Sequence, residues 1–335
     1  MVLLIIVLRI WHSAIALVSI SLGITVVNIA IDYIYILKKL SIHIKLKHWE
    51  KDLFIESLGY TSLMFIQTIA IQANGNIDNI VIGAVIGSTA VAVYSFGIQM
   101  FNMYESLATA FSNLMLPTIS VKIANNATDA ELQSTVTKVG RVQFMILGAA
   151  LAGFTVLGKE FIALWLGQGF EDVYSLSLIM MVPVTFTLIE NVCLSILRAR
   201  NLMKFRTLSL IVTAAFNAIV TIIGTYLWDY YAAAIGTGLS IVVGSIIMMN
   251  IYYHKKIGFK VIKFYADVLS RLVICILVPA IIVAVIARFY SGSWISFIIK
   301  AGIYVAIYVG LLLAYGMRPE EKEVFGYRLR KGNER

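Results

Sequence analysis

The stretch from Leu53 to Pro117 holds two long apolar segments, separated only by the Gly-Ser-Thr turn at residues 87–89. Each segment exceeds the ~20 residues that a helix needs to cross the hydrocarbon core of a bilayer, at about 1.5 Å per residue. Few chains can hide two such segments inside a soluble domain. The stretch therefore predicts two membrane-spanning helices joined by a tight turn.

Both segments carry polar side chains that a lipid-facing helix would not keep. They are Gln67, Gln72, Asn74, Asn76, Asp78 and Asn79 on the first segment, and Gln99, Asn102 and Glu105 on the second. Burying an unpaired polar group in hydrocarbon is costly, because lipid offers it no hydrogen-bond partner. We therefore expect these side chains to face other helices or a wet cavity, as in a transport pathway.

Composition extends this membrane assignment to the whole chain. Of the 335 residues, 60% are hydrophobic and 13% are charged, with a mean hydropathy of +0.89. No soluble domain of this size has such a composition, and the absence of strand-type alternation argues against a β-barrel. Cys193 and Cys275 both lie inside apolar runs, which predicts small core residues and neither a disulfide nor a metal site.

The apolar runs predict an all-α, multi-pass membrane protein with nine spans. These cover residues 13–37, 54–86, 89–117, 141–158, 174–199, 207–227, 232–253, 266–287 and 294–315. A kink or break is expected near Gly75, and a kink at Pro183, because proline removes a backbone donor. Thr128 and Glu131 form a capping-box pattern, which predicts a helix that begins at Asp129.

The basic residues fall almost entirely on one side of these spans. Of the 27 Lys and Arg residues, 23 lie on the side that also holds the C-terminus, and the other four are Arg9, Lys159, Arg288 and Lys300. Because positively charged connections remain in the cytoplasm, this asymmetry predicts a cytoplasmic C-terminus.

Several segments, taken in order and spacing, resemble one family of membrane proteins. They are residues 78–83, 91–95, 116–117, 158–167, 233–237 and 252–258, together with Asn217. They are similar to the Wzx-type polysaccharide flippases of the multidrug/oligosaccharidyl-lipid/polysaccharide exporter superfamily, whose members have two helical lobes. The resemblance implies an N-terminally incomplete chain. Residues 1–53 would be a remnant of the N-terminal lobe with one full span, 54–317 the C-terminal lobe with two accessory helices, and 318–335 a basic cytoplasmic tail.

The resemblance also implies a function. Such a protein flips an undecaprenyl-diphosphate-linked oligosaccharide across the bacterial inner membrane for surface polysaccharides such as O-antigen, beside glycosyltransferases and a polymerase. It is not an enzyme and needs no cofactor, and nucleic acid is not an expected partner. A cavity for this lipid requires a cation for the diphosphate, polar groups for the sugar and a lateral opening for the tail.

Amide side chains are the candidates for contact with the sugar, although interhelical hydrogen bonding would explain each of them as well. They are Gln72, Gln99, Asn102, Asn191 and Asn217. The predicted spans contain no Lys or Arg near their midpoints. Arg198, at the cytoplasmic end of its span, is the best candidate for the phosphate, with an anchoring role as the alternative.

Two acidic residues are expected to lie deep in the membrane. Glu105 and Glu190 each follow the outer end of their predicted span by roughly 24 Å, at ~1.5 Å per residue. A carboxylate at that depth must pair with a cation or be protonated for part of a cycle. We therefore expect both to couple ion movement to transport, with Asp78 as a third candidate nearer the outer rim. Fixing the helix register through hydrogen bonds is the alternative role.

Two other classes of membrane protein fit the sequence less well. A drug or cation antiporter of the same superfamily would share the polar pathway. A polysaccharide polymerase or ligase would present a substantial outer loop, whereas the longest outer connection here is about residues 159–173. The sequence contains no nucleophile–base set, no metal cluster and no phosphate-binding glycine loop.

The charge asymmetry gives a direct test of topology. Single cysteines placed at Gly167 and Trp228 should react with a membrane-impermeant thiol reagent in intact cells, whereas cysteines at Lys45 and Lys256 should react only after lysis. The reverse pattern would overturn the orientation argument.

Overall fold

The computed structural model describes residues 14–39, 51–125, 127–287, 292–319 and 321–322. The chain divides into two compact units, residues 1–60 and 61–335. In the first unit, α2 (Ala14–Lys39) exposes large apolar side chains such as Leu22, Val26 and Ile29. Helix α3 (Lys51–Val85) begins in the first unit and continues through the second, without a break at Gly75.

The second unit is built entirely from helices in its described part. After α3 come α4 (Ser88–Ala124), α5 (Asp129–Leu166), α6 (Asp172–Ile189), α7 (Val192–Ala199), α8 (Lys204–Trp228), α9 (Tyr231–Ser240), the π-helical segment η1 (Ile241–Met248), α10 (Met249–Ile257), α11 (Val261–Leu269), α12 (Leu272–Ala287), α13 (Trp294–Leu311) and the π-helical segment η2 (Leu312–Gly316). The all-α class expected from the sequence is confirmed.

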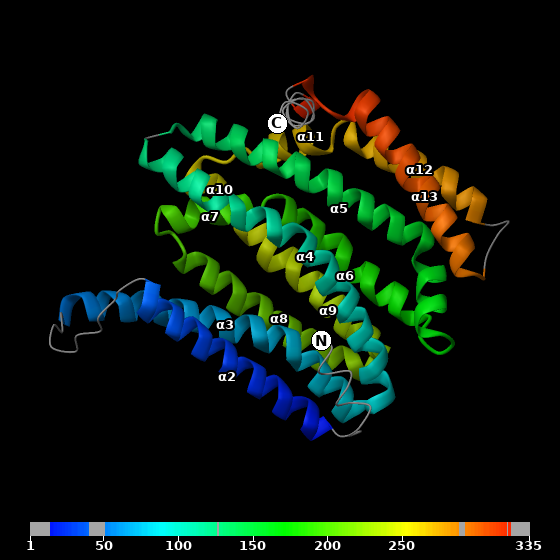
Figure 1. Ribbon diagram of the computed structural model, residues 1–335, viewed down its shortest axis with the longest axis horizontal. Helices are drawn as coiled ribbons and strands as arrows, with labels where there is room; N and C mark the ends of the chain where they lie inside the picture. The colour runs from blue at the N-terminus through cyan, green and yellow to red at the C-terminus, as the bar shows by residue number, and fades with distance from the viewer. Residues whose placement is uncertain (1–13, 40–50, 126, 288–291, 320, 323–335) are drawn as a thin grey trace. The chain divides into compact units, whose positions relative to one another are not determined.

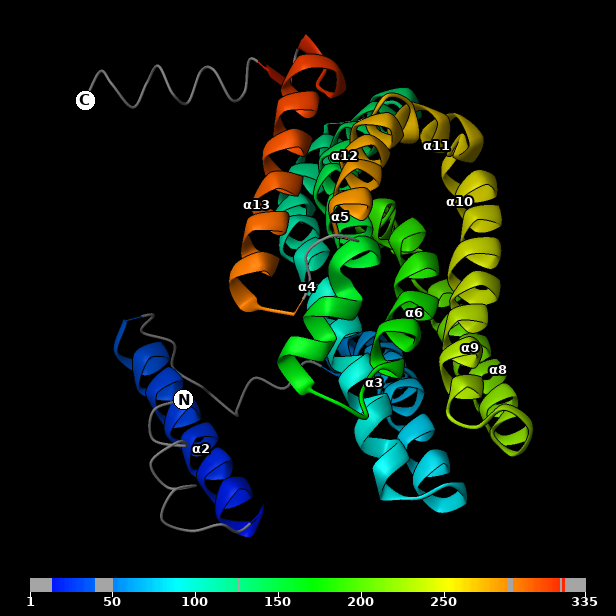
Figure 2. The same ribbon diagram turned by 90° about the vertical axis from the view of Figure 1, so that its right-hand side faces the viewer.

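Within this unit, α12 and α13 lie side by side along α5 (Figures 1 and 2). Helix α4 packs on α6 and α7, and α8 packs on α9. The largest core cluster joins α4, α5, α6, α7 and α10, with Tyr94, Leu147 and Ile189 fully buried. A smaller cluster around Cys275 and Tyr308 holds the α12–α13 pair against α5.

Five helices of the described residues are long and apolar enough to cross a membrane, or six if α11 and α12, bent by 45°, form one span. The predicted count of nine spans is thus not reproduced by this criterion. Helices α3 and α4 are long enough, but amide and acidic side chains interrupt their apolar sequences. The apolar part of α2, Leu22–Ile36, is short.

Local sequence signals explain where several helices begin and end. The predicted capping box is confirmed: Glu131 N–H donates to Thr128 Oγ1 at 3.3 Å, and Thr128 N–H donates to Glu131 Oε2 at 2.8 Å, so α5 begins at Asp129. The turn before α4 contains Gly87 at φ +124°, a backbone conformation that residues other than glycine rarely adopt. Helix α6 continues through Pro183, and the break falls at residues 190–191 instead.

An arginine clamp fastens the segment after η2 to the rest of the unit. The Arg141 side chain is buried, and its Nε and Nη2 donate to the two carboxylate oxygens of Glu321 at 2.7 and 3.2 Å. Its other donors reach the backbone carbonyls of Asp267 at 3.1 Å and Gly316 at 2.9 Å. Helices α5 and α11 and the chain beyond η2 therefore meet at one guanidinium.

This clamp sets the charge state of Glu321. Burial by itself would raise the pKa of this carboxyl, but hydrogen bonds and charge from Arg141 and Arg318 outweigh burial and hold the pKa below its ordinary value of 4.5. Because the pKa is lower in the folded state, the clamp contributes its full stability above the ordinary pKa. That contribution is lost as the pH falls through the lower folded value.

We expect Glu321→Gln to lower the free energy of unfolding by up to about 3–5 kcal/mol, because a buried guanidinium loses its carboxylate. Thermal unfolding of the purified protein in detergent would measure this change. Arg200→Gln is the matched control. It breaks a more exposed ion pair with Asp129 and should cost less than about 1 kcal/mol. Equal effects of the two substitutions at neutral pH would contradict the assignment of the clamp.

Candidate functional site: a polar cavity and a buried aspartate

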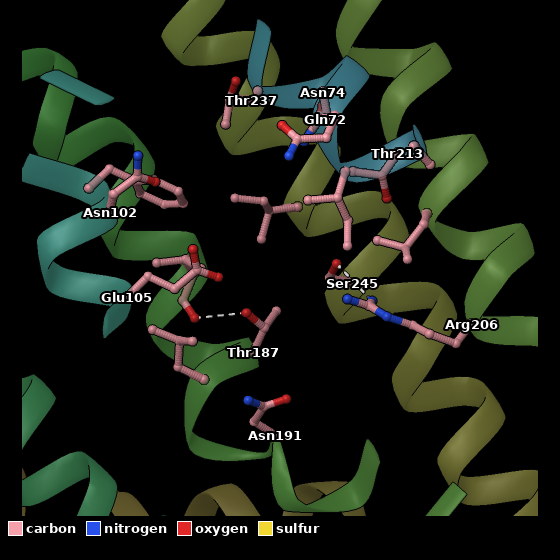
Figure 3. A pocket seen from close by; sticks show the side chains of 18 of the residues that line it. Gln72, Asn74, Asn102, Glu105, Thr187, Asn191, Arg206, Thr213, Thr237 and Ser245 are labelled. Carbon is pink, nitrogen blue, oxygen red and sulfur yellow. Dashed lines mark hydrogen bonds between the residues drawn. The ribbon is translucent and has the colours of Figure 1, made fainter. Parts of the chain in front are cut away.

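A polar cavity of about 490 Å³ lies among the helices of the second unit. Its walls come from α3, α4, α6, α7, α8, α9, η1 and α10 (Figure 3). Polar side chains line much of it: Gln72, Asn74, Asn76, Asn79, Asn102, Glu105, Thr187, Glu190, Asn191, Arg206, Thr213, Thr237 and Ser245. The polar faces of α3 and α4 thus face a cavity, as their sequences predicted.

One cation and two acids face this cavity. Glu105 of α4 and Arg206 of α8 enter from opposite sides (Figure 3), and Glu190 lies at the break between α6 and α7. Arg206 interacts electrostatically with both carboxylates, and its Nη1 donates to Ser245 Oγ at 3.4 Å. The structure therefore places both predicted acids beside a cation that the sequence analysis did not identify.

Arg206 was missed because the boundary of its helix was misplaced. The sequence analysis assigned it to a basic turn and began the span at residue 207, whereas α8 begins at Lys204. Arg206 consequently lies in the first turn of α8 and points into the cavity. Arg198, the predicted phosphate candidate, is exposed and does not line the cavity.

The predicted amides separate into three groups. Gln72, Asn102 and Asn191 line the cavity, and Gln72 Oε1 accepts a 3.4 Å hydrogen bond from Asn76 there. Gln99 is exposed and lies outside the cavity lining. Asn217 is fully buried beside the cavity and serves a different carboxylate. The sequence named the polar helices correctly, but it did not separate the amides by the direction in which they point.

That carboxylate is Asp78 of α3, which is 0% exposed. It accepts hydrogen bonds from Tyr94 Oη at 2.7 Å, Asn217 Nδ2 at 3.0 Å, Thr221 Oγ1 at 2.8 Å and Thr237 Oγ1 at 3.0 Å. All four donors are neutral and come from α4, α8 and α9. Burial of an ionised carboxylate without a cation is costly, so this cluster of oxygens suits a proton or a small hard cation.

Segment η1 brings the backbones of two cavity walls close together. Ser209 Oγ donates to the Gly244 carbonyl at 2.8 Å. A Cβ atom at Gly244 would lie 1.8 Å from Thr213 Oγ1. Only glycine therefore permits this approach of η1 to α8, and Ser245, the next residue, contacts Arg206. A π-helical segment of this kind often marks a functional site.

Comparison with known proteins agrees with this architecture. A solved structure described as "Lipid II flippase MurJ, inward closed conformation" superposes with a TM-score of 0.61 at 14% identity, covering 84% of this chain and 57% of that one. The fold is thus similar to that of this flippase, and the chain spans little more than half of the length of that protein. No curated protein sequence matches the chain.

The family model described as "Polysaccharide biosynthesis protein" matches residues 1–175. This segment is more than half of the chain and contains α2, α3, α4 and α5. The protein belongs to this polysaccharide biosynthesis family, and the resemblance noted in the sequence is confirmed.

The close contact at Gly244 predicts a strong effect of a small substitution. Gly244→Ala should destabilise the protein by about 1–3 kcal/mol, because the added methyl group overlaps the Thr213 side chain. Adding Thr213→Ala removes the overlapping hydroxyl and should restore much of the loss, as measured by thermal unfolding in detergent. A double variant no more stable than the single one would place the strain elsewhere.

Proposed function

We propose that this protein carries an undecaprenyl-diphosphate-linked oligosaccharide from the inner to the outer leaflet of the bacterial plasma membrane. The observation that carries the proposal is the cavity itself, in which one arginine is surrounded by amide side chains. Membership of the polysaccharide biosynthesis family and the flippase fold support it. Glycosyltransferases would supply the substrate and a polymerase would use the product.

The diphosphate is assigned to Arg206. A guanidinium presents several N–H donors to phosphate oxygens, and it remains charged at any physiological pH. Among the described residues its side chain donates one hydrogen bond, to Ser245 Oγ at 3.4 Å, which leaves most of its N–H donors for phosphate oxygens. Asn191, Asn102, Gln72 and Asn74 surround the remaining cavity and would bind sugar hydroxyls.

Asp78 is the proposed coupling site for an ion. It is fully buried, its donors come from three other helices, and Thr237 belongs to both the Asp78 cluster and the cavity wall. Binding of a proton or a small cation would change the hydrogen bonds that hold α3, α8 and α9 together. Such a site can bias one arrangement of helices over another, as ion-coupled transport requires.

The cavity also favours a second candidate function. Two carboxyl groups and one guanidinium line the cavity, so the lining would carry a net negative charge when both acids are ionised, and it would then attract a cationic small molecule. A drug or cation antiporter would use Glu105 and Glu190 to bind its substrate and would not require Arg206.

Reconstituted liposomes distinguish the two functions. A fluorescent undecaprenyl-diphosphate oligosaccharide should become accessible to a membrane-impermeant quencher in the presence of the protein. Arg206→Gln should reduce binding by about tenfold to a hundredfold, the equivalent of about 1.5–3 kcal/mol for a charge-assisted hydrogen bond. Asp78→Asn should abolish the response to an ion gradient.

Arg198→Gln is the matched control, because it removes an arginine outside the cavity and should leave binding unchanged. If Arg198→Gln lost binding while Arg206→Gln bound normally, the phosphate site would have to be assigned to Arg198, at the predicted cytoplasmic end of its span. If the protein takes up a lipophilic cation in a manner that depends on Glu105 and Glu190, and does not move the lipid, the result would contradict the flippase proposal and support an antiporter.

A further inference from the structure

Glu190 occupies an unusual place in the fold. Helix α6 ends at Ile189 and α7 begins at Val192, so Glu190 lies at the break between them, at the wall of the cavity. The residue is only 2% exposed. Its partners come from α8, α10 and α11, none of which is a sequence neighbour.

Both hydrogen-bond partners of Glu190 have a second arrangement within reach. Tyr265 Oη donates to Glu190 Oε2 at 2.8 Å, and the Phe186 carbonyl lies 3.3 Å from the same hydroxyl. Asn250 Nδ2 donates to Glu190 Oε1 at 3.3 Å and to Tyr265 Oη at 3.5 Å, while Asn250 Oδ1 is buried without a hydrogen-bond partner among the described residues. Turning this amide would break these two long bonds of Nδ2 and no hydrogen bond of Oδ1.

These alternatives fit the two charge states of a carboxyl group. An ionised Glu190 would accept from Tyr265 and Asn250, in the arrangement that the structure shows. A protonated Glu190 would donate from Oε1 to Asn250 Oδ1 after the amide turns, and Tyr265 would donate to the Phe186 carbonyl instead. The surroundings of Glu190 therefore accommodate both states with local rotations only.

The ionised state depends on one cation. The titratable groups that interact with Glu190 are Arg206 of α8, Tyr253 of α10, Tyr265 of α11 and Cys193 of α7. Arg206 alone among them is positively charged, and it also interacts with Glu105 of α4. An anion that engages Arg206 would neutralise this cation and leave a buried carboxylate uncompensated, which is strongly unfavourable.

We infer that Glu190 is a proton-binding site that fills when a diphosphate engages Arg206, so that the lipid substrate and a proton bind together. The inference rests on the proposed function, because it takes Arg206 as the diphosphate contact. The step is balanced: one proton moves from hydronium to Glu190 Oε1, so that one O–H bond breaks and one forms, and Arg206 keeps its charge while it binds phosphate oxygens.

Infrared difference spectroscopy tests the proton site without any lipid. A carbonyl-stretch band of a protonated carboxylic acid should appear in the purified protein as the pH falls, and it should be absent from Glu190→Gln. Asn250→Leu should shift this band, because it removes the acceptor of the proton. Glu171→Gln, which alters an exposed acid before α6, should leave the band unchanged. If no band belongs to Glu190 at any pH at which the protein is folded, the inference is wrong.

Binding of undecaprenyl diphosphate then tests the linkage to Arg206. Adding the lipid at constant pH should increase the Glu190 band in the wild type but not in Arg206→Gln. The Kd of the wild type should fall by up to about tenfold more per pH unit of acidification than that of Glu190→Gln, because one proton is taken up for each lipid bound. Titration of the lipid itself cancels in this comparison.

The outcomes separate the inference from the proposed function. Glu190→Gln resembles the protonated state, so it should bind the lipid at high pH as tightly as the wild type does at low pH, whereas a merely structural Glu190 would give weaker binding at every pH. Lipid binding without growth of the band would falsify the linkage. If the wild type binds no undecaprenyl diphosphate, the proposed function fails, and the lipid-free titration alone decides the proton site.

Discussion

A charged group removed from water must find its partners within the protein, and this requirement determines which helices of the second unit meet. Asp78 of α3 draws donors from α4, α8 and α9. Glu190 does the same with α10 and α11, and Arg141 joins α5 and α11 to the chain beyond η2. Apolar packing alone would allow each helix many rotations in lipid, because lipid tails are as apolar as the side chains they contact.

Asp78, Glu190 and Arg141 differ in how their charges are compensated, and the difference separates structure from function. Arg141 has a carboxylate and two carbonyls, which satisfies the guanidinium and fixes one arrangement. Asp78 has only neutral donors, and Glu190 shares a single cation with Glu105. An acid that lacks a dedicated cation gains from binding a proton or another positive ion. The incompletely compensated groups are therefore the ones suited to change state during transport.

The sequence predicted the class of fold, the capping box at Thr128 and the polar faces of α3 and α4, because each of these depends on a local pattern. It misplaced features that depend on tertiary contacts. The start of α8 was predicted three residues too late, so Arg206 was assigned to a turn and was not recognised as a cavity residue. The fifth predicted span was expected to be one helix with a kink at Pro183, whereas the helix breaks at residues 190–191, beside the hydrogen bonds of Glu190.

The two acids that lack a dedicated cation are connected through a single stretch of backbone. Thr237, near the end of α9, donates to Asp78, and Ser245, in η1, accepts from Arg206, which interacts with Glu190. Between them, Gly244 holds η1 against α8 so closely that no side chain fits. Tightly packed elements respond to a change at one end by moving as a unit rather than by deforming locally. The residues from Thr237 to Ser245 therefore join the buried aspartate to the cavity arginine, which is the physical connection that the proposed ion-coupled transport of an anionic substrate would need.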